Sequence, residues 1–156
     1  SVRTPDCCAS VCRASTPVVC ETVFALLPLW PKAQQGNGGF TDLRADWYRQ
    51  AAVWGAQNGI VSGTSRTTFA PDKAVTKEQA CALLARFART RGVQAAADAA
   101  PVYVAECSAW AQSGVQEAFG YGVCDSYACL AAPKDAATRA ELAHMLRLLS
   151  NRIQKV

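Results

Sequence analysis

The chain has 156 residues and a mass of 16.6 kDa, which is enough for one domain with its own buried core and too small for a two-domain enzyme. Apolar residues make up 51% of the chain and charged residues 18%, so a disordered protein is excluded, and the abundance of alanine favours an all-α fold. The net charge is +4, but the 16 basic residues are spread along the chain. A nucleic acid partner is therefore not expected, because nucleic-acid-binding proteins concentrate basic residues on one stripe.

Residues 1–36 form a first, short helical unit. A helix is predicted to begin after Thr16, because Pro17 suits the first helical position, where its missing N–H leaves no hydrogen bond unmade. The buried face of this helix is expected to consist of Cys20, Phe24 and Leu27. Pro28 ends the helix, and the glycine-rich stretch 34–39 is a flexible linker.

Residues 37–93, the central unit, read as a helix, an ordered loop and a second helix. The first helix is predicted over 49–58, and Gly59 ends it because glycine adopts the left-handed conformation without steric cost. The second helix opens at Thr76, whose side chain can cap it while Gln79 reaches back, which makes a capping box. The expected apolar face of this second helix is Ala80, Leu83, Leu84 and Phe87.

Residues 94–156, the third unit, repeat this plan. A helix after Trp110 is predicted to run to Gly120, and a loop then leads to a last helix. Thr138 and Glu141 have the spacing of a second capping box at the start of that helix. Its expected apolar face is Leu142, Leu146 and Leu149. The chain is therefore predicted to contain three copies of one helical plan.

The compartment is predicted from the apolar runs and the cysteines. No stretch reaches the roughly 18 apolar residues that span a bilayer, so membrane insertion is not expected. The first residues carry no apolar signal region, so the chain is expected to be either cytosolic or already processed. Eight cysteines in an even set favour disulfides and hence secretion. They are Cys7, Cys8, Cys12, Cys20, Cys81, Cys107, Cys124 and Cys129.

The cysteine spacing leaves an alternative and does not fix the pairing. Zinc sites favour C-x2-C pairs, and the chain has none. Zinc held by the four N-terminal thiols is the alternative interpretation, although the adjacent Cys7 and Cys8 make tetrahedral closure awkward. The one local disulfide we predict joins Cys124 to Cys129, and it would close a short loop.

Several spaced elements of the central unit match a known pattern. They are Phe40-Thr41-Asp42-Leu43, Trp47-Tyr48, Asn58-Gly59-Ile60-Val61-Ser62-Gly63, Phe69-Ala70-Pro71 and Val75-Thr76-Lys77-Glu78-Gln79-Ala80. This series resembles the S-layer homology repeat of bacterial surface proteins. The third unit carries that family's Thr-Arg-Ala-Glu signature at residues 138–141, whereas the first unit has Pro17 and Val19 where the signature has its basic and acidic residues. The resemblance implies one domain over residues 1–156, with three repeats arranged in pseudo-threefold symmetry around a central three-helix bundle.

The resemblance also implies a ligand. In that family, grooves between neighbouring repeats hold anionic secondary cell-wall polysaccharide, often carrying a ketal-pyruvate group. Matched residue by residue, Lys77 and Arg139 are the expected cations, and Trp47 and Gly63 are candidate groove residues. A carboxylate near Arg139 would also gain from the N–H groups and the dipole of a helix N-terminus. A solvated surface arginine is the alternative interpretation of Arg139.

The function expected is a non-enzymatic, secreted, disulfide-stabilised module that binds cell-wall polysaccharide at the bacterial surface. The alternative is a module of the same fold that recognises a host or partner protein, favoured by the degenerate first signature and the additional cysteines. No cofactor or metal is expected. His144 is the single histidine, so a proton relay or a two-histidine metal site is not expected.

Other notable side chains have simpler interpretations. Four carboxylates are interpreted as helix caps and turn formers and not as a catalytic acid/base pair, namely Asp42, Asp46, Glu78 and Glu141. Arg86, Arg89 and Arg91 read as a charged helix end. Core packing is the expected role of five aromatic residues, namely Trp30, Trp47, Tyr48, Trp54 and Trp110. For Trp47, Tyr48 and Trp110, stacking of a partly exposed ring on a sugar is the alternative.

Overall fold

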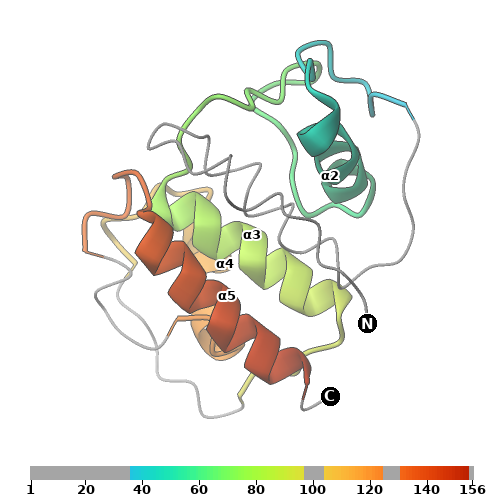
Figure 1. Cartoon of the computed structure of the whole chain (residues 1–156). Helices are drawn as coiled ribbons and strands as arrows, with labels where there is room; N and C mark the ends of the chain where they lie inside the picture. Colours follow the sequence, from blue (N-terminus) through green and yellow to red (C-terminus); the bar gives the residue numbers. More distant parts are fainter. Residues whose placement is uncertain (1–35, 97–103, 125–130, 155–156) are drawn as a thin grey trace.

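The computed structural model describes residues 36–96, 104–124 and 131–154. Within these ranges the chain forms four helices and no strand, as Figure 1 shows. The helices are α2 (Asp46–Gln57), α3 (Lys77–Thr90), α4 (Gln112–Gly120) and α5 (Arg139–Ile153). The predicted all-α class is confirmed for this part of the chain. The helix predicted after Thr16 lies outside it, and so does Cys129, the predicted partner of Cys124.

Both capping boxes predicted from the sequence are present. At the start of α3, the N–H of Gln79 donates to the Thr76 hydroxyl at 3.3 Å, and the Thr76 N–H donates to Gln79 Oε1 at 3.0 Å. At the start of α5, the N–H of Glu141 donates to the Thr138 hydroxyl at 3.2 Å, and the Thr138 N–H donates to Glu141 Oε2 at 2.8 Å. Such caps satisfy N–H groups that have no partner within the helix, so they fix where α3 and α5 begin.

Helices α2 and α4 end in the same turn. Gly59 follows α2 and Gly122 follows α4 after one intervening residue, and both have φ of +68°. The next residue in each case, Ile60 or Val123, bonds back into the last helical turn through its N–H at 2.8 Å. This is the C-terminal motif predicted at Gly59, and it recurs at the corresponding place in the third unit.

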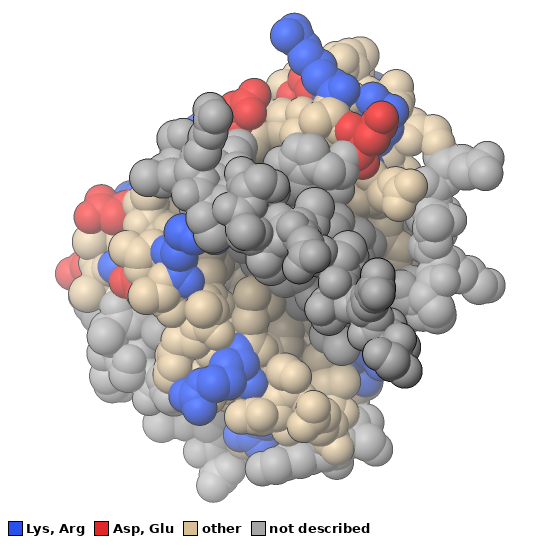
Figure 2. Space-filling view, in the orientation of Figure 1, with Lys and Arg blue, Asp and Glu red and all other residues tan. Residues whose placement is uncertain are grey.

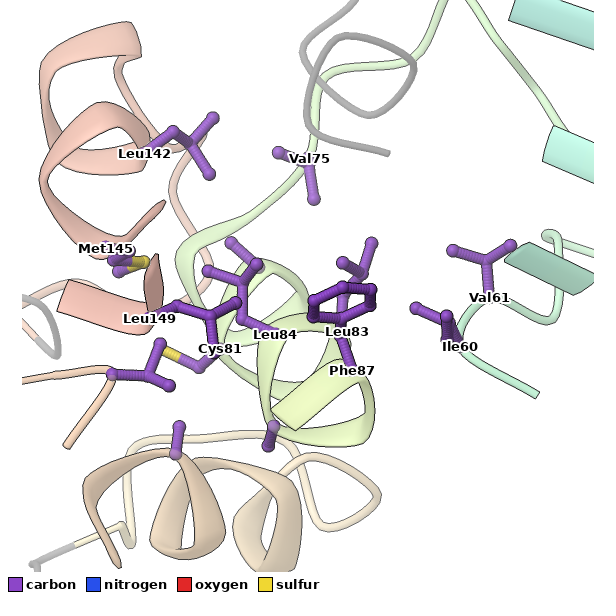
Figure 3. Packing of buried hydrophobic residues seen from close by; sticks show 14 of the residues in the cluster. Ile60, Val61, Val75, Cys81, Leu83, Leu84, Phe87, Leu142, Met145 and Leu149 are labelled. Carbon is purple, nitrogen blue, oxygen red and sulfur yellow. The ribbon is translucent and has the colours of Figure 1, made fainter. Parts of the chain in front are cut away.

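The buried core lies around α3, which packs against both α4 and α5. Figure 1 shows α3 and α5 side by side and running in the same direction. Figure 3 shows side chains of α3 between Met145 and Leu149 of α5 on one side and Ile60 and Val61 on the other. The whole predicted apolar face of α3 is buried, namely Ala80, Leu83, Leu84 and Phe87. Two helices of the predicted three-helix bundle are thus neighbours, and the third was predicted from Thr16.

The starts of α3 and α5 are joined through the backbone. Thr76 and Ala136 form an isolated antiparallel bridge, and the N–H of Lys77 donates to the Asp135 carbonyl at 3.0 Å. The two signature segments, which open at Thr76 and Thr138, therefore lie next to each other. Part of the N-terminal N–H set of α3 is satisfied by the loop that leads into α5.

The loops before α3 and α5 share an unusual backbone conformation. Ala70 and Ala132 have φ of +60° and +50°, and in the described ranges they are the non-glycine residues with positive φ. Each directly precedes a proline, Pro71 or Pro133. Residues with a Cβ seldom adopt this conformation, so its recurrence directly before both prolines is a local likeness between the two loops.

Candidate functional site

A pocket of about 500 Å³ lies where the loop after α2 meets α3. One wall is formed by residues 60–64 together with parts of 69–75, and the other by the face of α3 that carries Ala82, Leu83 and Arg86. Trp110, from the segment before α4, also lines it. The pocket therefore contains residues from both the central and the third unit.

Two cations and no carboxylate are found among the described residues that line this pocket. Lys73 is exposed, whereas Arg86 is half-buried and donates from Nη1 to the Ile60 carbonyl at 3.3 Å. That hydrogen bond holds the guanidinium against the pocket wall. Elsewhere on the visible face, Figure 2 shows Lys and Arg side chains in separate clusters instead of one band. A pocket with two positive charges and no opposing carboxylate favours an anionic ligand.

Trp110 is the large apolar side chain that the described residues leave most open to solvent. It is 54% exposed, so the expectation that it packs in the core is wrong. The residue that follows it, Ala111, is fully buried instead. The core-packing expectation is confirmed for Tyr48 and Trp54, which are buried. An exposed indole that lines a pocket can stack against a sugar ring.

Gly63 lies in the pocket wall in a conformation that favours glycine. Its φ is +71°, and a Cβ built at this position would lie 2.6 Å from the Thr68 carbonyl oxygen and 2.7 Å from Phe40 Cε1. The chain there has no space for a side chain. Of the site residues predicted from the sequence, Gly63 is the one that lines this pocket.

Lys77 and Arg139 occupy matching positions as the first residues of α3 and α5. Lys77 Nζ lies 3.0 Å from Glu141 Oε1 and donates to the Ala131 carbonyl at 3.0 Å, and its side chain is 13% exposed. We call this group, Lys77 with Glu141 and the Ala131 carbonyl, the clasp. Arg139 is exposed. Trp47 lies in the first turn of α2, and its side chain is outside the part that the structure describes.

The clasp is expected to weaken in acid. A hydrogen bond from the Thr138 backbone and contacts with Lys77 hold the pKa of Glu141 below its ordinary value of 4.5, although burial acts in the opposite direction. Because this pKa is lower in the folded than in the unfolded chain, the carboxylate stabilises the fold above about pH 4.5, and that stabilisation is lost as the pH falls through the folded pKa. We expect Glu141→Gln to lower the free energy of unfolding by about 1 kcal/mol at pH 7 and by less at pH 3. Urea titrations at the two pH values measure the change in the free energy of unfolding. An equal loss at pH 7 and pH 3 would contradict the proposed role of the Glu141 charge.

Two other carboxylates, those of Asp42 and Glu78, accept hydrogen bonds from backbone N–H groups of distant segments. Asp42 accepts hydrogen bonds from the N–H groups of Phe69 at 2.9 Å and Ala70 at 2.7 Å. Burial of Asp42 raises its pKa, but these hydrogen bonds outweigh it, and the pKa lies below the ordinary value. Glu78 is 4% exposed and accepts from both the N–H and the hydroxyl of Ser108, each at 2.8 Å. The turn-forming role predicted for Asp42 is thus observed, whereas Glu78 links α3 to the segment before α4.

Sequence reasoning missed Lys73 and Arg86 as site residues, whereas it gave stacking on a sugar as the alternative role of Trp110. Arg86 was interpreted as part of a charged helix end, yet it follows the buried Leu83 by one helical turn, and this spacing places it at the edge of the buried face. Arg89 pairs instead with Glu117 of α4, which raises the pKa of Arg89. For Lys73 the sequence carries no comparable signal.

Candidate metal sites and membrane-spanning helices are absent from the described part of the chain. Over the described ranges, no group of three or more His, Cys, Asp or Glu side chains could hold a metal ion. None of the described helices has the length and apolar character needed to cross a bilayer. Cys81, Cys107 and Cys124 are buried. The other five cysteines lie outside these ranges.

Comparison with known proteins gives two matches. Residues 39–81 match the family model of the S-layer homology domain. The chain is also 34% identical, over 93 residues or 57% of its length, to the "Surface-layer 125 kDa protein" of Lysinibacillus sphaericus. The aligned part spans 8% of the length of that relative. No solved structure matches the chain.

Proposed function

The chain carries an S-layer homology domain, and from that premise we propose that it is a non-catalytic module that binds anionic cell-wall polysaccharide at the bacterial surface. The observation that carries the proposal is the pocket at α3, which combines Lys73, Arg86 and the exposed Trp110 with no lining carboxylate among the described residues. The surface location is supported by the relative, which is named as a surface-layer protein.

The chemistry of the pocket fits a sugar that bears a carboxylate, such as a ketal-pyruvate group. A carboxylate between Lys73 and Arg86 would make charge-assisted hydrogen bonds, each worth roughly 1.5–3 kcal/mol where water is largely excluded. The planar guanidinium of Arg86 can donate two parallel bonds, which the ammonium of Lys73 cannot. Trp110 would stack on the apolar face of the sugar ring.

The predicted signature cations have different parts in this proposal. Arg139, exposed at the start of α5, provides a second contact for an extended polymer. Lys77 is engaged by Glu141 and Ala131 in the clasp, so its part is to hold the two units together and to add positive charge nearby. Gly63 permits the close approach of the pocket wall, and Trp47 stays a predicted groove residue.

The proposal is tested by isothermal titration calorimetry with purified pyruvylated wall polysaccharide. We expect measurable binding by the unmodified chain and about tenfold weaker binding for Lys73→Ala and for Trp110→Ala, since each removes roughly 1.4 kcal/mol of contact. Both side chains are exposed, so their loss leaves the core intact. Arg66→Ala is the matched control, because Arg66 is an exposed cation of the same loop that does not line the pocket.

Two further outcomes are decisive. The polymer from which the pyruvate ketal has been removed by mild acid should bind much more weakly, because the carboxylate is lost. Absence of heat with the pyruvylated polymer, or equal affinities for Lys73→Ala and Arg66→Ala, would contradict the proposed site.

A protein partner is the second candidate, favoured by the exposure of Trp110. Tryptophan is prominent among the residues that dominate protein–protein binding, and this one is 54% exposed. A pull-down with the chain as bait, from extracellular material that contains both wall polymer and proteins, separates the two functions. The protein-binding function would be favoured by a stoichiometric protein partner whose capture is lost in Trp110→Ala, with no polysaccharide retained.

A further inference from the structure

The Cys81 and Cys124 thiols meet in the core between the central and third units. Their Sγ atoms are 3.3 Å apart, and the two residues are 0% and 3% exposed. A disulfide has an S–S length of about 2.05 Å, so the two sulfurs would have to approach each other by about 1.2 Å to form the bond. From this contact we infer that Cys81 and Cys124 form a disulfide when the chain folds in an oxidising environment.

The two sulfurs are brought together by elements with little freedom to move. Cys81 lies in α3, with Leu84 beside it in Figure 3. Cys124 follows the turn at Gly122, in which the N–H of Val123 donates to the Ala118 carbonyl at 2.8 Å. The helix and the turn therefore fix both Cα positions. The contact does not depend on a flexible loop.

The third described thiol, Cys107, is a poorer partner. In the described ranges, Cys81 with Cys124 is the cysteine pair whose sulfurs are in contact. Burial raises the pKa of the Cys107 thiol, and the nearby carboxylate of Glu78 raises it further. The contact between the sulfurs of Cys81 and Cys124 is therefore the observation that selects this pair over Cys107.

The oxidation is a thiol–disulfide exchange with an external disulfide, either that of a thiol oxidoreductase or glutathione disulfide. The thiolate of one cysteine attacks the external disulfide, forms a mixed disulfide and releases one external thiol. The thiolate of the second cysteine then attacks the first and displaces the other external thiol. The two protein thiols lose two protons and two electrons in total, and the external disulfide gains them. Because both cysteines are buried in the folded chain, the exchange takes place before α3 and α4 close over them.

The disulfide would restrain the two segments that line the pocket as well as those that form the core. Ala82 and Leu83, which follow Cys81 in α3, line one wall, and Trp110 comes from the same unit as Cys124. The disulfide thus ties the two contributors to the pocket without touching its surface. It is independent of which ligand the pocket takes.

Peptide mapping of the unmodified chain tests the inference directly. The full chain is refolded in a mixture of reduced and oxidised glutathione, free thiols are blocked with iodoacetamide, and non-reduced peptides are analysed by mass spectrometry. We expect a linked peptide pair that contains Cys81 and Cys124. Linkage of Cys124 to Cys129, which the sequence suggested, or alkylation of Cys81 in the refolded chain would overturn the inference.

Thermal melts of variants give a second measure. Cys81→Ala and Cys124→Ala should each lower the melting temperature of the oxidised chain by about 10 °C, because the bond closes a long loop of the unfolded chain. The double variant should have the same melting temperature as either single variant. Cys107→Ala is the matched control, since it also removes a buried thiol. An equal fall for Cys107→Ala would assign the effect to lost packing and overturn the inference.

Discussion

Replacing Gly63 by alanine is expected to lower the free energy of unfolding by about 3 kcal/mol. Two effects add. The left-handed φ of +71° is unfavourable for any residue with a Cβ, and that Cβ would overlap the Thr68 carbonyl oxygen and the Phe40 ring at 2.6 and 2.7 Å. The backbone of the pocket wall must shift to relieve the overlap. Urea unfolding followed by circular dichroism measures the loss.

Gly59→Ala is a closely matched control for this experiment. Gly59 has nearly the same φ, +68°, but a Cβ there meets nothing within 4 Å. Gly59→Ala should therefore lose only the free energy that comes from the unfavourable φ, about 1 kcal/mol. Equal losses for the two variants would mean that the wall accommodates a methyl group at residue 63, and the tight packing described around Gly63 would then be wrong.

Removing the buried carboxylate of Glu78 is the second change with a large expected effect. Glu78→Ala leaves the N–H and the hydroxyl of Ser108 without the acceptor they both use at 2.8 Å. Hydrogen bonds to a charged group are worth roughly 1.5–3 kcal/mol each, and a buried donor without a partner is costly. We expect a loss of about 3 kcal/mol in the free energy of unfolding, measured by chemical denaturation.

Two further variants show whether that loss comes from the hydrogen bonds. Glu78→Gln keeps the shape and one acceptor oxygen, so its loss should be intermediate. Glu106→Ala removes an exposed carboxylate close in sequence to Ser108 and should change the stability by less than about 0.5 kcal/mol. Equal stability of Glu78→Ala and the unmodified chain would show that Ser108 finds other acceptors.

The parts of the fold that the sequence predicted well are local. The capping boxes at Thr76 and Thr138 and the turn at Gly59 are specified within a few residues, and all three are present. The first helix of the central unit was predicted from Arg49 but begins at Asp46. Asp46 carries a negative charge suited to the first turn, and this local signal was not used.

The parts that were missed depend on distant contacts. The pairing of Lys77 with Glu141 joins residues of two units, and nothing near Lys77 in the sequence indicates that its charge has a partner. Likewise, the exposure of Trp110 follows from how the segment before α4 lies against α3, which periodicity does not predict. The contact between Cys81 and Cys124 required both units to be in place. The pocket is made of such contacts, so the sequence identified Gly63 but not the cations around it.

The clasp limits how this chain can be truncated or recombined. Lys77 of the central unit pairs with Glu141 of the third unit, so each unit contributes one partner of this ion pair. A fragment that stopped after α3 would leave an ammonium group and an apolar helix face without their counterparts. Excision and shuffling should therefore keep the central and third units together, and melting of α3 and α5 should proceed as a single cooperative event.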